Sequence, residues 1–181
     1  MSSGCRAFYH DKRPGDPLIS YDPTRQVSLE ILRSLKYHTS FIEGPDYVQH
    51  SRKIARDLGF LLAGENSKVV WDFIGPGRKG GTQMSSSKPS RYMASFDILM
   101  IIVSGMHCVD IEDPISGSLI RIERGPGTVQ LIPAGSLGCF VPCAHKAIMF
   151  IQSSQPEYQL VRDEDVQKFA LHREYLKSIG L

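Results

Sequence analysis

Short segments rich in β-branched and aliphatic residues recur along the chain from Lys68 onward, and turn-forming residues separate them. Many short strands at regular spacing are typical of an antiparallel barrel or sandwich. The pattern predicts strands at residues 69–74, 97–103, 106–111, 119–122, 129–132, 139–141 and 147–152. Turns are expected between them at residues 104–105, 114–117, 125–127 and 133–135. The chain is therefore predicted to be mostly β.

Helical patterns precede this β-rich region. Residues 1–26 contain Asp-Pro and Pro-Gly pairs, which indicate turns rather than helices. Leucines then follow at intervals of three, with Ser28 placed to cap the first turn, so a short amphipathic helix is expected at residues 28–37. A second helix is expected between Pro45 and Gly59, because proline favours the first turn of a helix and glycine favours its end.

The C-terminal residues return to helical periodicity. Val166, Phe169 and Ala170 would share one side of a helix over roughly residues 163–178. A length of 181 residues suits a single domain that builds its own core. We therefore expect one domain over residues 1–181, with N-terminal turns and helices at 1–67, a barrel at 68–155 and a C-terminal helix at 156–181.

The composition limits the kinds of partner and compartment. A formal net charge of +2 is too small to favour nucleic acid or an anionic membrane. No apolar run approaches the length of a bilayer span, and residues 1–16 contain no signal-peptide core. The four cysteines are scattered, unlike a secreted disulfide framework, so we expect a cytoplasmic protein. The Gly/Lys-rich segment 75–91 lacks the Gly-Lys-Ser/Thr ending of a phosphate loop and is expected to be a solvated loop.

Seven segments follow one another in an order that points to a known family: AFYHDKRPGDP, DPTRQVSLEILRSL, SGMHCVDI, LIRI, GTVQLIPAG, KAIMFI and HREYLKSIGL. Together they resemble the acireductone dioxygenase family of the cupin superfamily, the oxygen-using enzymes of methionine salvage. The resemblance spans nearly the entire chain. It implies the cupin fold, a jelly-roll-like double-stranded β-barrel with short N-terminal helices and a C-terminal helix.

The resemblance also implies where a metal site would lie. Members of the family bind iron or nickel through a His-x-His pair, a glutamate shortly after it and a third histidine just beyond the Pro-Ala-Gly turn. Three imidazoles and one carboxylate leave two positions of an octahedral ion for an enediol substrate and oxygen. In this chain the first three ligands would fall within residues 90–98 and the fourth at Gly138.

The expected ligand types are missing from these positions. Residues 90–98 contain no histidine and one acid, Asp97, while the stretch between Lys53 and Met106 contains no histidine at all. We therefore predict no catalytic residue, no metal ligand and no bound cofactor. Methionine fills irregular gaps, so the space of the metal and substrate is expected to be filled by side chains of that region: Met93, Phe96, Met100 and Met106.

A relocated metal site is the alternative, built from His107, Cys108, Cys139, Cys143 and His145. Thiolates and imidazoles together suit zinc. However, Cys139 directly follows Gly138, so in a regular strand it points to the opposite face from the expected ligand position. The cysteines could equally be small buried hydrophobic residues, with the histidines at strand ends or on the surface.

Three functions remain open from the sequence. The first is a catalytically inactive acireductone dioxygenase-like cupin that serves as a structural or protein-interaction component of a larger assembly, contacting neighbours through edge strands, the 75–91 loop and the terminal segments. The second is a metal-dependent dioxygenase of methionine salvage, or another metalloenzyme, with substituted ligands. The third is a metal-free binder of a small ligand at the barrel mouth. Metal content of the purified protein separates the first two.

Overall fold

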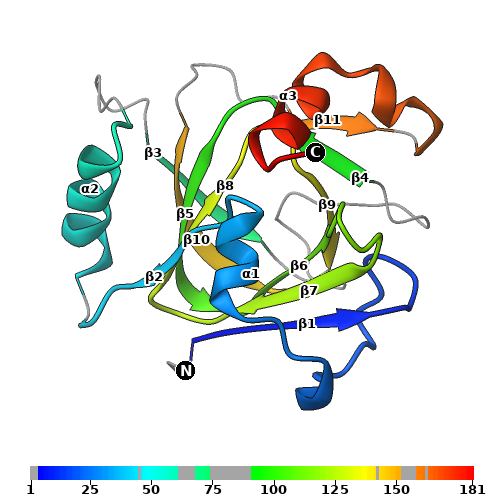
Figure 1. Cartoon of the computed structure of the whole chain (residues 1–181). Coiled ribbons are helices and arrows are strands. Elements are labelled where there is room, and N and C mark those ends of the chain that lie inside the picture. Colours follow the sequence, from blue (N-terminus) through cyan, green and yellow to red (C-terminus); the bar gives the residue numbers. More distant parts are fainter. Residues whose placement is uncertain are drawn as a thin grey trace.

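Two antiparallel β-sheets face each other and short helices surround them in the computed structural model (Figure 1). The structure describes residues 4–44, 46–60, 68–73, 91–141, 143–151, 158–161 and 163–181. The predicted loop at 75–91 lies outside the described residues except for Arg91. The prediction of a mostly β chain is confirmed.

The first sheet has six strands. Their spatial order is β1 (Cys5–His10), β7 (Leu119–Arg124), β6 (His107–Glu112), β9 (Leu137–Val141), β4 (Arg91–Ala94) and β11 (Tyr158–Val161). Every neighbouring pair in this sheet is antiparallel. Ile111 of β6 pairs with both Ile120 of β7 and Gly138 of β9, and Gly138 in turn pairs with Tyr92 of β4. These four residues therefore form one row across the sheet.

The second sheet has five strands. Their spatial order is β2 (Thr39–Phe41), β8 (Thr128–Ile132), β5 (Ile98–Gly105), β10 (His145–Ile151) and β3 (Lys68–Phe73). Its neighbouring pairs are also antiparallel. All seven strands predicted from the sequence are present in the two sheets, with boundaries shifted by at most two residues.

Four further strands were not predicted from the hydrophobic pattern. β1 lies in the segment 1–26 that was expected to form turns, and it pairs with β7 along six residues. β2 and β4 are only three and four residues long, and β11 follows the predicted barrel range. The sheets therefore include strands on both sides of residues 68–155.

The predicted N-terminal helices are confirmed. In α1 (Leu29–Ser34), the Ser28 hydroxyl oxygen accepts a hydrogen bond from the Ile31 amide at 3.2 Å, as expected for the capping residue. In α2 (Tyr47–Asp57), the Asp46 carboxylate caps the helix by accepting from the Gln49 amide at 3.1 Å. A short 3-10 turn, η1 (Pro23–Arg25), precedes α1.

The C-terminal helix is shorter than predicted. Residues 163–178 divide into a 3-10 turn, η3 (Asp163–Lys168), and α3 (Ala170–Ser178), because Phe169 between them has an extended backbone. The α3 helix is anchored at two places. His172 Nδ1 lies 2.9 Å from the carbonyl oxygen of Gly135 in the turn before β9, and the Tyr175 hydroxyl donates to the carbonyl of Leu35 after α1 at 3.1 Å.

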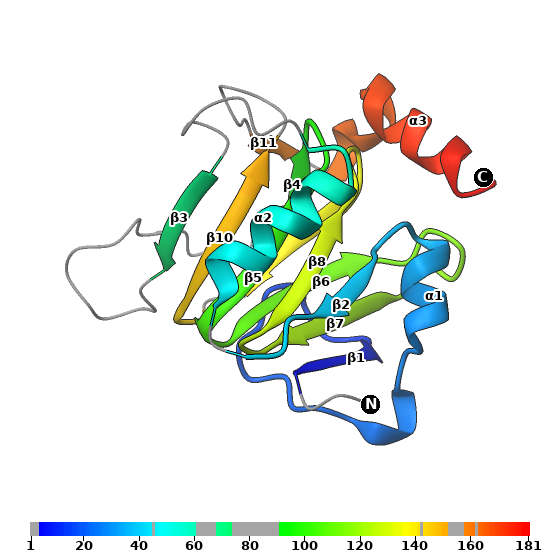
Figure 2. The same cartoon turned by 90° about the vertical axis from the view of Figure 1, so that its left-hand side faces the viewer.

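The main core lies between the two sheets and follows the alternation of each strand. Its residues include Met100 and Ile102 of β5, Ile120 and Ile122 of β7, and Met149 of β10. The opposite face of the five-stranded sheet packs against α2, which lies across it in Figure 2. This second cluster contains Ala55, Phe60, Leu99, Ile101, Val129, Ile148 and Phe150.

The outer face of the six-stranded sheet carries a buried ion cluster. Arg121 of β7 contacts Asp110 of β6 through Nε at 2.5 Å and through Nη2 at 3.0 Å. Asp110 also accepts from the Gly15 amide at 2.6 Å, and His10 Nε2 lies 3.2 Å away. Arg121 Nη2 donates to the carbonyl of Asp16 at 2.8 Å. The cluster therefore fixes the Pro-Gly-Asp-Pro turn onto the sheet.

The charge of Asp110 is maintained by these contacts. Burial opposes its ionisation, but hydrogen bonds from His10, Arg121 and the Gly15 amide outweigh that effect and hold the pKa of the carboxyl below its usual value. A buried, bidentate carboxylate–guanidinium pair of this kind is strongly coupled. Removing one partner leaves the other charge buried and uncompensated.

We expect Asp110→Asn to lower the free energy of unfolding by about 3–5 kcal/mol, because Arg121 is then buried without its counter-charge. Glu112→Gln on the same strand is the matched control. Its pair with Arg91 is partly solvated, with side chains 33% and 27% exposed, so a loss of at most about 1 kcal/mol is expected. Urea unfolding of both variants measures the difference, and equal losses would contradict the assigned role of the cluster.

Candidate functional site

The position expected for the last metal ligand is occupied by an aromatic ring. Tyr92 and Gly138 are register partners, and a Cβ atom on Gly138 would lie 2.7 Å from the Tyr92 hydroxyl oxygen and 2.8 Å from Cζ. Tyr92 is buried and stacks on Phe140, with ring centroids 4.0 Å apart and planes at 13°. The stacked ring cannot move aside freely, so residue 138 has no room for a side chain.

The described residues of the other expected ligand segment have different structural roles. Arg91 donates to Glu112 at 2.7 Å, and Met93 packs with Leu137 and Val166 in a small cluster beside the main core. Asp97 is exposed, and its carboxylate accepts a hydrogen bond from the Ala134 amide at 2.8 Å. The one acid of the segment therefore stabilises the Pro-Ala-Gly turn.

The predicted filling of the interior is correct only in part. Met100 lies in the core between the sheets, and Phe96 packs against that core. Met93 belongs to the separate cluster described above, and Met106 is 39% exposed. The principal occupant of the expected ligand position is Tyr92, which the methionine pattern did not indicate.

The five residues of the possible relocated metal site are separated by the alternation of the strands. His107 shares the inner face of β6 with Val109 and Ile111, and its ring meets that of His145 edge to face at 4.6 Å. Cys108 and Cys139 lie on the outer face with Asp110, since Cys139 and Asp110 are register partners. Among the residues that the structure describes, no group of three or more His, Cys, Asp or Glu side chains could hold a metal ion.

The three cysteines of this set form a thiol pair, Cys108 with Cys143, and a separate buried thiol, Cys139. A hydrogen bond between Cys108 and Cys143 raises the pKa of Cys108, with burial adding to the effect, and lowers the pKa of Cys143. Burial raises the pKa of Cys139 to about 11. The raised pKa values of Cys108 and Cys139 disfavour the thiolate form that binds zinc or acts as a nucleophile, whereas the lowered pKa of Cys143 favours it.

The barrel interior contains a buried arginine, Arg124, which was not predicted from the sequence. Arg124 lies on the same face of β7 as Ile120 and Ile122, has 0% exposure, and pairs in register with Cys5 and His107. Its Nε, Nη1 and Nη2 atoms have no hydrogen-bond partner among the residues that the structure describes. The alternation Ile-x-Ile-x-Arg over residues 120–124 could have revealed it, because it places a cation on the apolar face of a strand.

The histidines beside Arg124 are held neutral. Burial, followed by the positive charge of Arg124 and the proximity of His145, lowers the pKa of His107 well below its usual value. The pKa of His145 is also lowered, chiefly by burial, although its Nδ1 lies 3.0 Å from the carbonyl oxygen of Cys143. This end of the barrel therefore combines one fixed cation with two neutral imidazoles.

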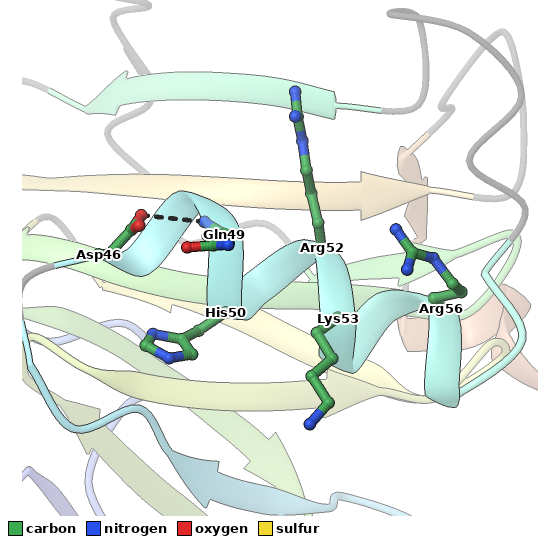
Figure 3. Close-up of a pocket in the computed structure, with 6 residues that line it drawn as sticks. All are labelled: Asp46, Gln49, His50, Arg52, Lys53 and Arg56. Carbon is green, nitrogen blue, oxygen red and sulfur yellow. Dashed lines mark hydrogen bonds between the residues drawn. The ribbon is translucent and has the colours of Figure 1, made fainter.

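A second candidate site lies on the outside of α2. A pocket there is lined by Asp46, Gln49, His50, Arg52, Lys53 and Arg56, which Figure 3 shows along successive turns of the helix. All six side chains are exposed. Arg52, Lys53 and Arg56 form no ion pair with any residue that the structure describes, so this face of α2 presents concentrated positive charge. No helix among the described residues is long and apolar enough to cross a membrane.

Comparisons with known proteins place the fold. The chain is 28% identical to acireductone dioxygenase 1 of Coprinopsis cinerea, over 97% of this chain and 98% of that protein. The structure matches acireductone dioxygenase from Bacillus anthracis, solved with a cadmium ion in its active center, with a TM-score of 0.62 and 11% identity. The match covers 86% of this chain and 97% of the other. No family model matches the sequence. The predicted cupin fold is confirmed.

We expect Gly138→Ala to destabilise the protein by about 1–3 kcal/mol, because the added methyl group overlaps the ring of Tyr92. Gly125→Ala is the control, since a Cβ there would meet its nearest atom at an ordinary 3.5 Å, and a loss under about 1 kcal/mol is expected. In a Tyr92→Ala background the Gly138→Ala penalty should largely disappear. Urea unfolding in a double-mutant cycle measures this coupling, and additive losses would contradict the direct overlap.

Proposed function

We propose that this chain, a homologue of acireductone dioxygenase with the cupin fold, does not carry out the metal-dependent reaction of those enzymes and acts as a protein-binding component of a larger assembly. The observation that carries the proposal is the Tyr92 ring beside Gly138. It occupies the position where the family resemblance expects a metal-binding histidine. We further propose the cytoplasm as its location.

The residues present do not fit an iron or nickel ion of the family type. Such an ion needs several nitrogen and oxygen donors held rigidly around one point. This chain has a glycine overlapped by Tyr92 at the fourth ligand position. Within residues 90–98 its charged side chains are an arginine paired with Glu112 and an aspartate that accepts a hydrogen bond from a turn amide. We therefore derive no reaction step through a metal at this place.

The basic face of α2 supports the protein-binding part of the proposal. Three exposed cations lie within five residues of each other, Arg52, Lys53 and Arg56, and the only acid lining the same pocket is Asp46. The α2 helix packs against the sheet through Ala55 and its apolar neighbours, so these three charged side chains are not part of the core. They suit an acidic surface on another protein, whose charge they would complement.

A metalloenzyme with substituted ligands is the second candidate. Homology over nearly the whole chain supports an enzymatic role as well as a non-enzymatic one. The His107 and His145 rings, 4.6 Å apart inside the barrel, are the observation in its favour, because neutral imidazoles are common metal ligands. The nearby charge of Arg124 opposes a divalent cation at that place.

Purified protein, stripped with a chelator and then incubated with Fe²⁺, Ni²⁺ or Zn²⁺, should retain far less than one ion per chain. Its melting temperature should not rise with added metal, because an ion that bound only the folded state would stabilise it. Elemental analysis and thermal unfolding measure the two effects. One ion per chain, lost on His107→Gln or His145→Gln, would instead establish the metalloenzyme candidate.

Charge reversal on α2 tests the partner. In the triple variant Arg52→Glu, Lys53→Glu and Arg56→Glu, we expect the chain to leave the large-particle fraction of a native cell extract and to sediment as a free protein. The control reverses three exposed cations elsewhere, Lys12→Glu, Arg33→Glu and Lys177→Glu. Wild-type association should also weaken with salt, since exposed charges are screened. A free wild-type chain, or equal effects of both variants, would contradict the proposed surface.

A further inference from the structure

The buried guanidinium of Arg124 forms no ion pair with any residue that the structure describes. Burial lowers its pKa, yet an arginine side chain remains charged at neutral pH. The ionisable groups that act on it most strongly are Tyr92, Cys5, Tyr37 and Cys108, which are neutral near pH 7 at their usual pKa values. None of its three nitrogen atoms donates a hydrogen bond to the described part of the chain.

The nearby carboxylates are used elsewhere. Glu123, the neighbour of Arg124 along β7, faces the other side of the sheet and contacts Arg6 at 2.6 Å. Asp110 belongs to the outer cluster with Arg121. The contrast between the two arginines of β7 is informative. Arg121 makes two hydrogen bonds to a carboxylate and one to a backbone carbonyl, whereas Arg124 makes none with the described residues.

An unpaired buried charge is costly. Moving an ion out of water into a protein interior carries a penalty that only a partner of opposite charge and satisfied hydrogen bonds can offset. A buried donor left without an acceptor adds to that penalty. A bound anion that contacts the guanidinium would therefore stabilise the folded state.

The other polar groups around Arg124 also match a negative partner. His107 pairs with Arg124 in register, and its Nδ1 has no hydrogen-bond partner within the described ranges. A neutral imidazole can donate one N–H. The lowered pKa values of His107 and His145 mean that they add no charge. The site therefore has one positive charge and one neutral hydrogen-bond donor, and an anion with a single negative charge would neutralise it.

We propose that Arg124 and His107 bind a small monoanionic carboxylate inside the barrel. The flat guanidinium fork can donate two parallel N–H groups to the two oxygens of a carboxylate. The site is distinct from the expected metal position. His107 lies four residues along β6 from Ile111, the register partner of Gly138, which corresponds to about 13 Å. The proposal stands independently of the protein-binding role.

The test is the unfolding of the full chain in different anions. Because Arg124 is fully buried, the protein is unfolded in urea and refolded in each buffer, so that the anion can enter. The reference buffer contains only a bulky sulfonate as anion. Formate, acetate, chloride, nitrate and phosphate are then compared at equal ionic strength. Formate or acetate should raise the urea midpoint in a saturable way, with chloride and nitrate at least tenfold less effective.

Two variants locate the effect. Arg124→Met should abolish the response to formate and acetate and should raise the midpoint in the sulfonate buffer, because it removes the unpaired charge. The control Arg56→Met, on the exposed face of α2, should respond as the wild type does. Cys5→Asp places a carboxylate at the register partner of Arg124. It should raise the midpoint in sulfonate buffer and make the protein insensitive to added carboxylate.

Each outcome decides the proposal. A wild-type midpoint that is the same in all anions, or an Arg124→Met variant that still responds to carboxylates, overturns it. Equal stabilisation by chloride, nitrate and carboxylates overturns the assignment to a carboxylate. If Arg124→Met does not fold, Cys5→Asp is decisive, and an unchanged response of that variant overturns the site. Metal binding and particle association do not enter this experiment, so its failure leaves the proposed function untouched.

Discussion

The packing of the Tyr92 ring against the backbone of Gly138 determines what the interior of this barrel can hold. The two residues face each other across neighbouring strands, and the stacked Phe140 ring keeps Tyr92 in place. A side chain at position 138 and an aromatic ring at position 92 exclude each other. The tyrosine at position 92 therefore requires a glycine, and excludes a histidine, at position 138.

The two faces of the six-stranded sheet each carry a buried arginine, but only the arginine on the outer face is paired with a carboxylate among the described residues. On the outside, Arg121 and Asp110 neutralise each other and hold the N-terminal turn. On the inside, Arg124 faces neutral side chains. Since residues 121 and 124 lie on one short strand, the difference arises from the pleat alone, which directs one arginine toward a carboxylate and the other toward the interior.

Much of the fold could be predicted from the sequence because seven strands are apolar and bounded by turns. β2 and β4 could not, since their short segments include Thr39, Ser40 and Arg91 and give no clear apolar run, and β1 is interrupted by charged and polar residues. The five candidate zinc ligands come from two segments, 107–108 and 139–145, and strand alternation divides them between two faces. The contact between the Tyr92 ring and Gly138 could not be predicted, because it depends on the register of β4 and β9, which local sequence patterns do not determine.

The C-terminal helix joins two parts of the chain that are far apart in sequence. His172 of α3 contacts the Gly135 carbonyl of the turn before β9, while Tyr175 contacts the Leu35 carbonyl at the end of α1. The backbone of Leu171 lies so close to Gly135 that a Cβ there would overlap it. A force applied to α3 would therefore act on both the turn before β9 and the end of α1.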